Sequence, residues 1–132
     1  MSLLVVDASA VLTVILAADA DRIAERMAGA DLAAPHLAPF EVANVVRRRW
    51  SAGVLSLGQA ELALDGFGLL VIDLWPFAAV ADRVWALRGQ LSSYDAAYIA
   101  LAELLDAPLL TADARLARAA AAAGSAARVE TA

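Results

Sequence analysis

The chain has 132 residues, 62% of them apolar, and a formal net charge of −5. That length is typical of one domain, and that apolar content is ample for a buried core. The chain has no cysteine and one histidine, and all ten of its basic residues are arginine; this excludes disulfides, zinc sites built from cysteine and histidine, and every mechanism that needs a lysine.

The surplus of apolar residues indicates that part of the surface is covered by a partner. A two-fold homodimer is the commonest symmetric way to cover it. No apolar run is long enough to span a bilayer. The stretch Met1 to Asp7 has no basic start and reaches an acid too early for a signal peptide. We therefore expect a cytoplasmic protein that does not associate with membranes.

Short apolar runs and helical spacings alternate along the chain. In chain order they predict a strand over 3–6, helices over 10–16 and 19–28, a weak strand over 32–34, a helix over 40–50, a helix opening at 56, a strand over 70–74, helices over 77–88 and 94–105, a strand over 109–111, an alanine-rich helix to 123 and a short edge strand over 127–130. Ser9 is a candidate N-cap, Pro39 suits a first helical residue, and Ser56 with Gln59 forms a capping-box pattern.

This alternation predicts one α/β domain over residues 1–132, with a mainly parallel sheet covered by helices on both faces. Such a sheet binds its ligands beyond the carboxyl ends of the strands. Asp7 and Asp113 lie at two such ends, and Glu41 and Asp95 lie near the starts of two helices. Because helix starts after parallel strands face the same edge, the four carboxylates can converge on one cleft. Asp7 and Asp113 can share an ion if their strands are adjacent.

Carboxylates held close together repel each other, so protons or a cation must relieve the repulsion. Oxygen ligands without histidine or cysteine suit Mg²⁺, with Mn²⁺ as an alternative. Three small polar residues accompany the acids as candidate supports. Ser9 comes two residues after Asp7, Thr111 two before Asp113, and Asn44 one helical turn after Glu41.

Each acid also has a simpler interpretation. Glu41 and Asp95 can merely favour the positive ends of their helices, and Asp113 can be a turn or N-cap residue. Asp7 is harder to explain in this way, because it follows four apolar residues of a buried strand. Other polar and aromatic residues carry weaker signals: Asp73 is expected on an exposed face or edge, His36 in solvent, Arg47 to Arg49 on a solvated helix face, and the three tryptophans in the core or an interface.

Four segments give the chain a resemblance to the PIN-domain ribonucleases, most closely to the VapC toxins of bacterial toxin–antitoxin pairs. They are Val5-Val6-Asp7-Ala8-Ser9, Pro39 to Asn44, Tyr94 to Tyr98, and Leu110-Thr111-Ala112-Asp113, in the family's order and spacing. The resemblance implies a three-layer α/β/α sandwich whose five parallel strands have the order 3-2-1-4-5. It also implies Mg²⁺-dependent endonuclease action on RNA with Asp7, Glu41, Asp95 and Asp113 as catalytic metal ligands, a homodimer, and inhibition by a small VapB-like antitoxin.

One departure from the family's pattern concerns the residues after Asp113. Some PIN domains carry a further acid there, but this chain has Ala114 and Arg115. A second metal position is therefore in doubt, and Arg115 and Arg118 are candidates to meet RNA phosphates instead. Arg47, Arg48 and Arg49 extend this basic rim, although an acidic chain predicts weak general affinity for RNA.

Two other classes with acidic strand ends do not fit. A phospho-receiver domain needs paired acids on its first strand and a lysine on its last, and this chain has neither. A haloacid-dehalogenase-like phosphatase needs a second aspartate two residues after the first, where Ser9 stands. The alternative that remains is a PIN fold without catalytic activity that serves as a binding module.

Overall fold

The computed structural model describes residues 1–132 and contains one five-stranded sheet. Its strand order is β3-β2-β1-β4-β5, and every neighbouring pair is parallel. The strands are β1 (Ser2–Val6), β2 (Ala30–Pro35), β3 (Ile72–Trp75), β4 (Leu109–Thr111) and β5 (Val129–Thr131). The predicted parallel sheet and its strand order are therefore confirmed.

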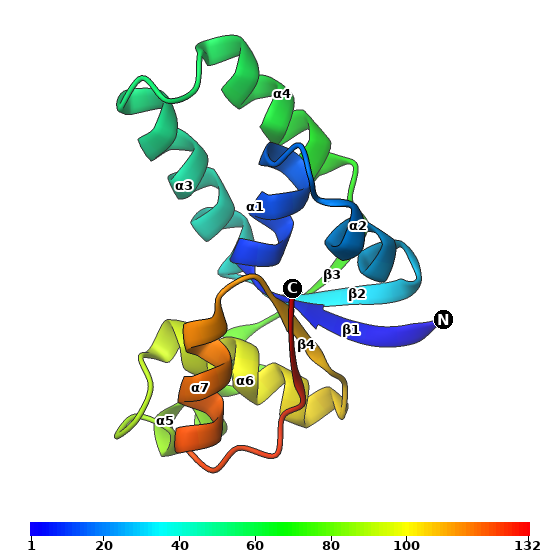
Figure 1. Cartoon of the computed structure of the whole chain (residues 1–132). Helices are drawn as coiled ribbons and strands as arrows, with labels where there is room; N and C mark the ends of the chain where they lie inside the picture. The colour runs from blue at the N-terminus through cyan, green and yellow to red at the C-terminus, as the bar shows by residue number, and fades with distance from the viewer.

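Helices cover both faces of the sheet (Figure 1). The helices are α1 (Ala8–Leu16), α2 (Asp21–Ala28), α3 (Ala38–Ser51), α4 (Leu57–Gly68), α5 (Ala81–Ala86), α6 (Ser93–Leu105) and α7 (Ala114–Ala122), with a 3₁₀ turn η1 at Phe77–Ala79. Helices α1 to α4 lie on one face, and α5 to α7 lie on the other. The molecule is thus the expected three-layer α/β/α sandwich.

The core lies along the two central strands and the helix beneath them. Leu4, Val5 and Val6 of β1 and Leu109 of β4 are fully or almost fully buried. Helix α6 packs across β1, β2 and β4 and is buried at every position from Ala96 to Ala102. Such burial on all sides is what a central helix of a doubly wound sheet requires. It gives the site a rigid floor.

Local sequence signals account for most helix ends. Ser56 and Gln59 form the predicted capping box at the start of α4. Gly124 follows α7 with a positive φ of 70°, which glycine adopts without strain. No helix is both long enough and apolar enough to cross a membrane.

Some predicted boundaries were wrong. The predicted N-cap Ser9 lies inside α1, whose N-cap is Asp7, because the helix begins at Ala8 directly after β1. The single helix predicted over 77–88 is a 3₁₀ turn followed by the short α5, interrupted at Val80, whose φ of −123° and ψ of 1° are neither helical nor extended. The weak strand predicted over 32–34 is the longer β2, because pairing with both β1 and β3 stabilises its ends.

The strand order places a topological switch point between β1 and β4. The chain winds from β1 to β2 and β3 over one face, and then returns through β4 and β5 over the other. At that point the segments leaving the carboxyl ends of β1 and β4 diverge to opposite faces, which opens a cleft in folds of this kind. Asp7 and Asp113 leave the sheet there.

Candidate active site

Asp7 is the buried centre of the polar cluster at the switch point. Its side chain is 6% exposed, yet both carboxylate oxygens have partners. Oδ1 accepts hydrogen bonds from the Ser9 hydroxyl at 2.7 Å and from the backbone N–H of Ala10 at 2.9 Å. Oδ2 accepts one from the Thr111 hydroxyl at 2.6 Å. These bonds fix the carboxylate while it caps the first turn of α1.

Thr111 connects the two central strands of the sheet. Its side chain is fully buried, and its hydroxyl oxygen lies 3.1 Å from that of Ser9. The same oxygen accepts a hydrogen bond from the backbone N–H of Asp113 at 2.9 Å. Thr111 therefore sets the position of Asp113 relative to Asp7, which supports its predicted role beside the acids.

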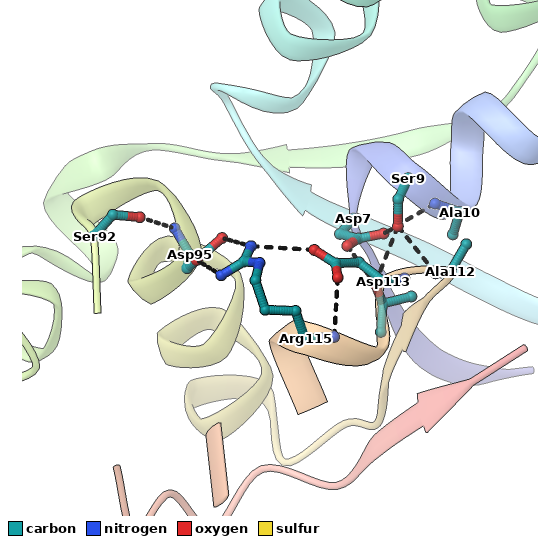
Figure 2. Close-up of polar contacts among 9 residues, drawn as sticks. Asp7, Ser9, Ala10, Ser92, Asp95, Ala112, Asp113 and Arg115 are labelled. Carbon is teal, nitrogen blue, oxygen red and sulfur yellow. Dashed lines mark hydrogen bonds and ion pairs between the residues drawn. The ribbon is translucent and has the colours of Figure 1, made fainter. Parts of the chain in front are cut away.

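Arg115 joins two of the predicted acids (Figure 2). Its Nη1 donates to Asp95 Oδ2 at 2.9 Å, and its Nη2 lies 3.4 Å from Asp95 Oδ1 and 3.1 Å from Asp113 Oδ2. Its backbone N–H donates to Asp113 Oδ1 at 3.0 Å. The guanidinium thus bridges the first turn of α6 and the N-cap of α7, where the partners are partly exposed.

Glu41 is held by a tyrosine rather than by a cation. It lies in the first turn of α3, and its Oε1 accepts a hydrogen bond of 2.6 Å from the hydroxyl of Tyr98 in α6. Tyr98 is 4% exposed. A buried hydroxyl needs a partner, so this bond stabilises the tyrosine and orients the glutamate together.

Burial and mutual repulsion raise the pKa of two of these acids. Burial is the main cause that raises the pKa of Asp7; the hydrogen bonds from Thr111, Ser9 and Ala10 lower it only in part, and the charge of Asp113 raises it further. Burial also raises the pKa of Glu41, opposed by the Tyr98 bond and reinforced by the charges of Asp7 and Asp95. The carboxylates thus act on one another electrostatically, and additional positive charge would stabilise their ionised forms.

The structure places all four predicted acids at the same edge of the sheet, but the acids do not form a closed shell of metal ligands. No three acidic side chains lie near enough to one another to hold a single ion in this arrangement. The simpler interpretations of two acids also apply. Asp113 is the N-cap of α7, and Asp95 lies in the first turn of α6, where a negative charge is favoured. These acids therefore stabilise helix starts, and they also repel one another electrostatically.

The remaining predicted residues divide between the site and its surroundings. Ser9 and Thr111 bond to Asp7, whereas the Asn44 side chain accepts from Arg47 at 3.0 Å instead of reaching the acids. Arg48 and Arg49 line a groove of about 490 Å³ between α1 and α3 that begins at Ser9. Arg118 is exposed on α7.

The donor set fits a hard divalent cation. All the candidate ligands are carboxylate oxygens at one sheet edge, and Arg115 already supplies positive charge between Asp95 and Asp113. The donor chemistry therefore suits such a cation, although no three of the acids lie close enough in this arrangement to hold one. For Asp95 and Asp113 to face an ion, the Arg115 side chain has to withdraw from them.

Two features of the site were not predicted from the sequence. Tyr98 was not expected to bond to Glu41, although it lies one helical turn after Asp95 on the same helix. Arg115 was expected to meet RNA, and its pairing with Asp95 and Asp113 depends on how α6 and α7 pack. The exposed Asp73 and His36 agree with their expected places. Trp50 is half exposed and Trp85 largely exposed, so of the two places expected for them, the core and an interface, the structure excludes the core.

Comparison with known proteins agrees with this geometry. The family model described as PIN domain matches residues 4–122. The chain is similar to the VapC ribonuclease Mb0985 of Mycobacterium bovis, with 38% identity over 114 residues that cover 86% of this chain and 88% of the relative. The chain belongs to the PIN-domain family and, within it, groups with the VapC ribonucleases.

Two solved structures share the fold at lower sequence identity. PAE2754 from Pyrobaculum aerophilum matches with a TM-score of 0.70 and 21% identity, covering 97% of this chain and 83% of its own. VapBC2 from Rickettsia felis, bound to a DNA fragment from its promoter, matches with a TM-score of 0.70 and 14% identity, covering 98% of both chains. The resemblance inferred from the four motifs is confirmed.

Replacing Asp7 by asparagine should stabilise the metal-free protein at neutral pH. Asparagine can keep the cap bond from Ala10 and removes a buried charge, so we expect Tm to rise by about 2–5 °C at pH 7.5. Because burial raises the pKa of Asp7 in the folded state, the cost of burying its charge is present above that pKa and disappears as pH falls through it toward the unfolded value of 3.8. The stabilisation should therefore shrink near pH 4.

Thermal unfolding in chelator at both pH values measures this effect. Asp73→Asn is the matched control, because Asp73 is exposed on the edge strand β3 and loses no buried charge. A Tm for Asp7→Asn below that of the wild type at pH 7.5 would contradict the electrostatic account.

Proposed function

We propose that this chain is the toxin ribonuclease of a toxin–antitoxin pair and cleaves RNA in the cytoplasm with a divalent metal, Mg²⁺ or alternatively Mn²⁺. The observation that carries the proposal is the buried Asp7, fixed by three hydrogen bonds beside Asp113 at the switch point of a PIN fold. A buried carboxylate with a raised pKa is costly to stability, which is typical of a functional position.

The ligands of the metal would be Asp7, Asp95 and Asp113, with Glu41 completing the set directly or through water. Such an ion would lower the pKa of a water molecule and offset charge that develops on a phosphodiester. Ser9 and Thr111 hold the Asp7 carboxylate in one orientation, and Tyr98 does the same for Glu41. Fixed ligands need little reorganisation during the reaction, which favours catalysis.

The RNA would approach along the sheet edge that carries these acids. Arg48 and Arg49 line the groove that begins at Ser9, and Arg47 and Arg118 are exposed on either side on α3 and α7. These arginines are candidates to pair with phosphates on both sides of the cut. The chain has few positively charged side chains near the site and a net charge of −5, so strong general binding to RNA is not expected. Recognition of RNA shape through a small number of contacts fits this charge better.

The nuclease proposal predicts that purified protein cleaves RNA when Mg²⁺ or Mn²⁺ is added. Asp7→Asn should lower the rate by roughly a hundredfold or more, because it removes a charge from the ion's ligands. Asp73→Asn should cleave like the wild type, since Asp73 lies on an exposed strand edge. Mapping the RNA ends after brief expression of the chain would identify the substrate.

Two outcomes of that assay would contradict the proposal. Full cleavage by a folded Asp7→Asn variant, or cleavage that persists in excess chelator, would exclude this site and mechanism. A wild-type protein that binds RNA or protein partners but never cleaves at any metal concentration would be a catalytically silent PIN-fold binding module.

A small VapB-like antitoxin is the partner proposed for the apolar surface near the acids. The groove between α1 and α3 continues at Leu16 into a second groove of about 200 Å³ against α4, lined by Leu55, Leu62 and Ala63. Its other end is at Ser9, which bonds to Asp7. An apolar segment in this groove would bury area, and an Arg or Lys at its end would reach the carboxylates.

This arrangement predicts that the product of a neighbouring small gene co-purifies with the chain and stops RNA cleavage. Leu62→Glu should weaken that complex by roughly tenfold or more, since Leu62 is exposed in the groove and its charge would be desolvated. Leu104→Glu, exposed on α6 on the other face, is the control. Tight binding without loss of cleavage would point to a stand-alone PIN nuclease.

A homodimer is proposed for a second apolar surface. Four exposed aromatic residues follow the carboxyl ends of the strands or lie on α5 and α6: Phe40, Phe77, Trp85 and Tyr94. These segments lie on the side of the molecule where β2 and β3 end (Figure 1). Aromatic residues at a surface favour protein interfaces, and one two-fold contact would cover them in both copies.

Sedimentation at tens of micromolar protein should detect this dimer, because a dimer with a Kd of about 1 μM is mostly associated at such concentrations. Trp85→Glu should convert it to a monomer by placing a charge inside the contact. Val71→Glu should leave the protein dimeric, because the exposed Val71 precedes β3 and so lies at the amino ends of the strands, away from the proposed surface. A wild-type monomer, or equal effects of the two substitutions, would contradict the proposed surface.

A further inference from the structure

Arg115 occupies the acidic cluster more completely than an ordinary surface ion pair. Each oxygen of both the Asp95 and Asp113 carboxylates accepts a hydrogen bond from Arg115, through the guanidinium or the backbone N–H. Figure 2 shows the guanidinium lying between the two carboxylates, which come from different helices. Arg115 therefore offsets part of the charge of the two carboxylates that Ser9, Thr111 and Tyr98 leave without hydrogen-bond donors.

The guanidinium and a divalent ion need the same oxygens. A guanidinium and a divalent ion on the same carboxylate oxygens repel each other, so each weakens the binding of the other. Arg115 is 58% exposed on a flexible side chain, and exposed ion pairs are weak and exchange readily. Its withdrawal leaves the backbone of α7 unchanged, because the cap bond from its own N–H to Asp113 does not depend on the side chain.

We propose that Arg115 is an exchangeable internal counter-ion: it pairs with Asp95 and Asp113 in the metal-free protein, yields them to the metal, and then pairs with an RNA phosphate. This inference rests on the proposed nuclease function. A released guanidinium remains tethered two residues from Asp113, beside the acids where the RNA must lie to be cut. Its planar fork suits phosphate as well as carboxylate.

The charge of the side chain at position 115 decides what this position contributes to the cluster. An acid at residue 115 would add a ligand but would also add repulsion in the metal-free state. An arginine there removes repulsion in the metal-free state and adds a phosphate contact in the loaded state. An antitoxin cation entering the cluster would have to displace the same guanidinium.

The test compares Mn²⁺ binding by the full chain, Arg115→Gln and Arg118→Gln, measured by calorimetry or by the loss of free-Mn²⁺ resonance. Arg118 is exposed on the same helix, so its variant has the same net charge without an ion pair at the acids. Arg115→Gln should bind Mn²⁺ roughly three- to tenfold more tightly than Arg118→Gln at low salt, and the difference should shrink as salt rises.

Two further measurements separate exchange from a general charge effect. In chelator, Arg115→Gln should lower Tm more than Arg118→Gln, because it leaves Asp95 and Asp113 without their cation. At saturating metal, Arg115→Gln should raise KM for RNA with little change in kcat, whereas at limiting metal it should cleave faster than the wild type. Arg115→Lys should restore part of the RNA affinity, since lysine keeps the charge without the planar fork.

The inference fails if Arg115→Gln binds Mn²⁺ no more tightly than Arg118→Gln, or if its RNA cleavage changes in the same direction at limiting and saturating metal. If the wild type cleaves RNA and binds Mn²⁺, that failure concerns Arg115 alone. If the wild type neither binds Mn²⁺ nor cleaves RNA, the nuclease proposal and this inference both fall.

Discussion

Negative charge gathered at the carboxyl ends of β1 and β4 is the constraint to which the surrounding structure responds. Asp7 is almost completely removed from water, and the fold compensates with donors from Ser9, Ala10 and Thr111. These bonds lower its pKa less than burial raises it, so the charge stays costly. Protonation of the carboxylate or a nearby cation can supply the remaining compensation without disturbing the packing.

The sheet and the two helix layers explain why this charge can be held at all. Leu4 to Val6 and Leu109 are buried between α1 and α6, so the strand ends that carry the acids are rigid. Tyr98 on α6 fixes Glu41 on α3 across the sheet edge, and Arg115 on α7 fixes Asp95 on α6. Helices α6 and α7 thus each contribute both an acid and the group that holds a neighbour's acid. Stability and the proposed chemistry use the same contacts.

The apolar surplus of the chain has a place in this structure as well. The buried core does not use all of it, and large apolar side chains are exposed at α4 and around α5 and the start of α6. The first area adjoins the groove that leads to Ser9, and the second lies beside the strand ends. The two partners proposed above, an antitoxin segment and a second copy of the chain, would therefore not compete for one surface.

The sequence by itself determined the fold class and, through its family resemblance, the strand order, because strand and helix periodicity and motif order are present in local residue patterns. The role of the four acids as metal ligands stays a prediction. It also predicted Ser9 and Thr111 as polar supports of Asp7 and Asp113 respectively, whereas the bond from Thr111 to Asp7 appears only in the structure. Only the tertiary structure decided that Asp7 rather than Ser9 caps α1, that Asn44 turns to Arg47, and that Tyr98 and Arg115 hold Glu41, Asp95 and Asp113. Those partners are set by how α3, α6 and α7 pack at the sheet edge, and distances between side chains on different elements leave no local signal in the sequence.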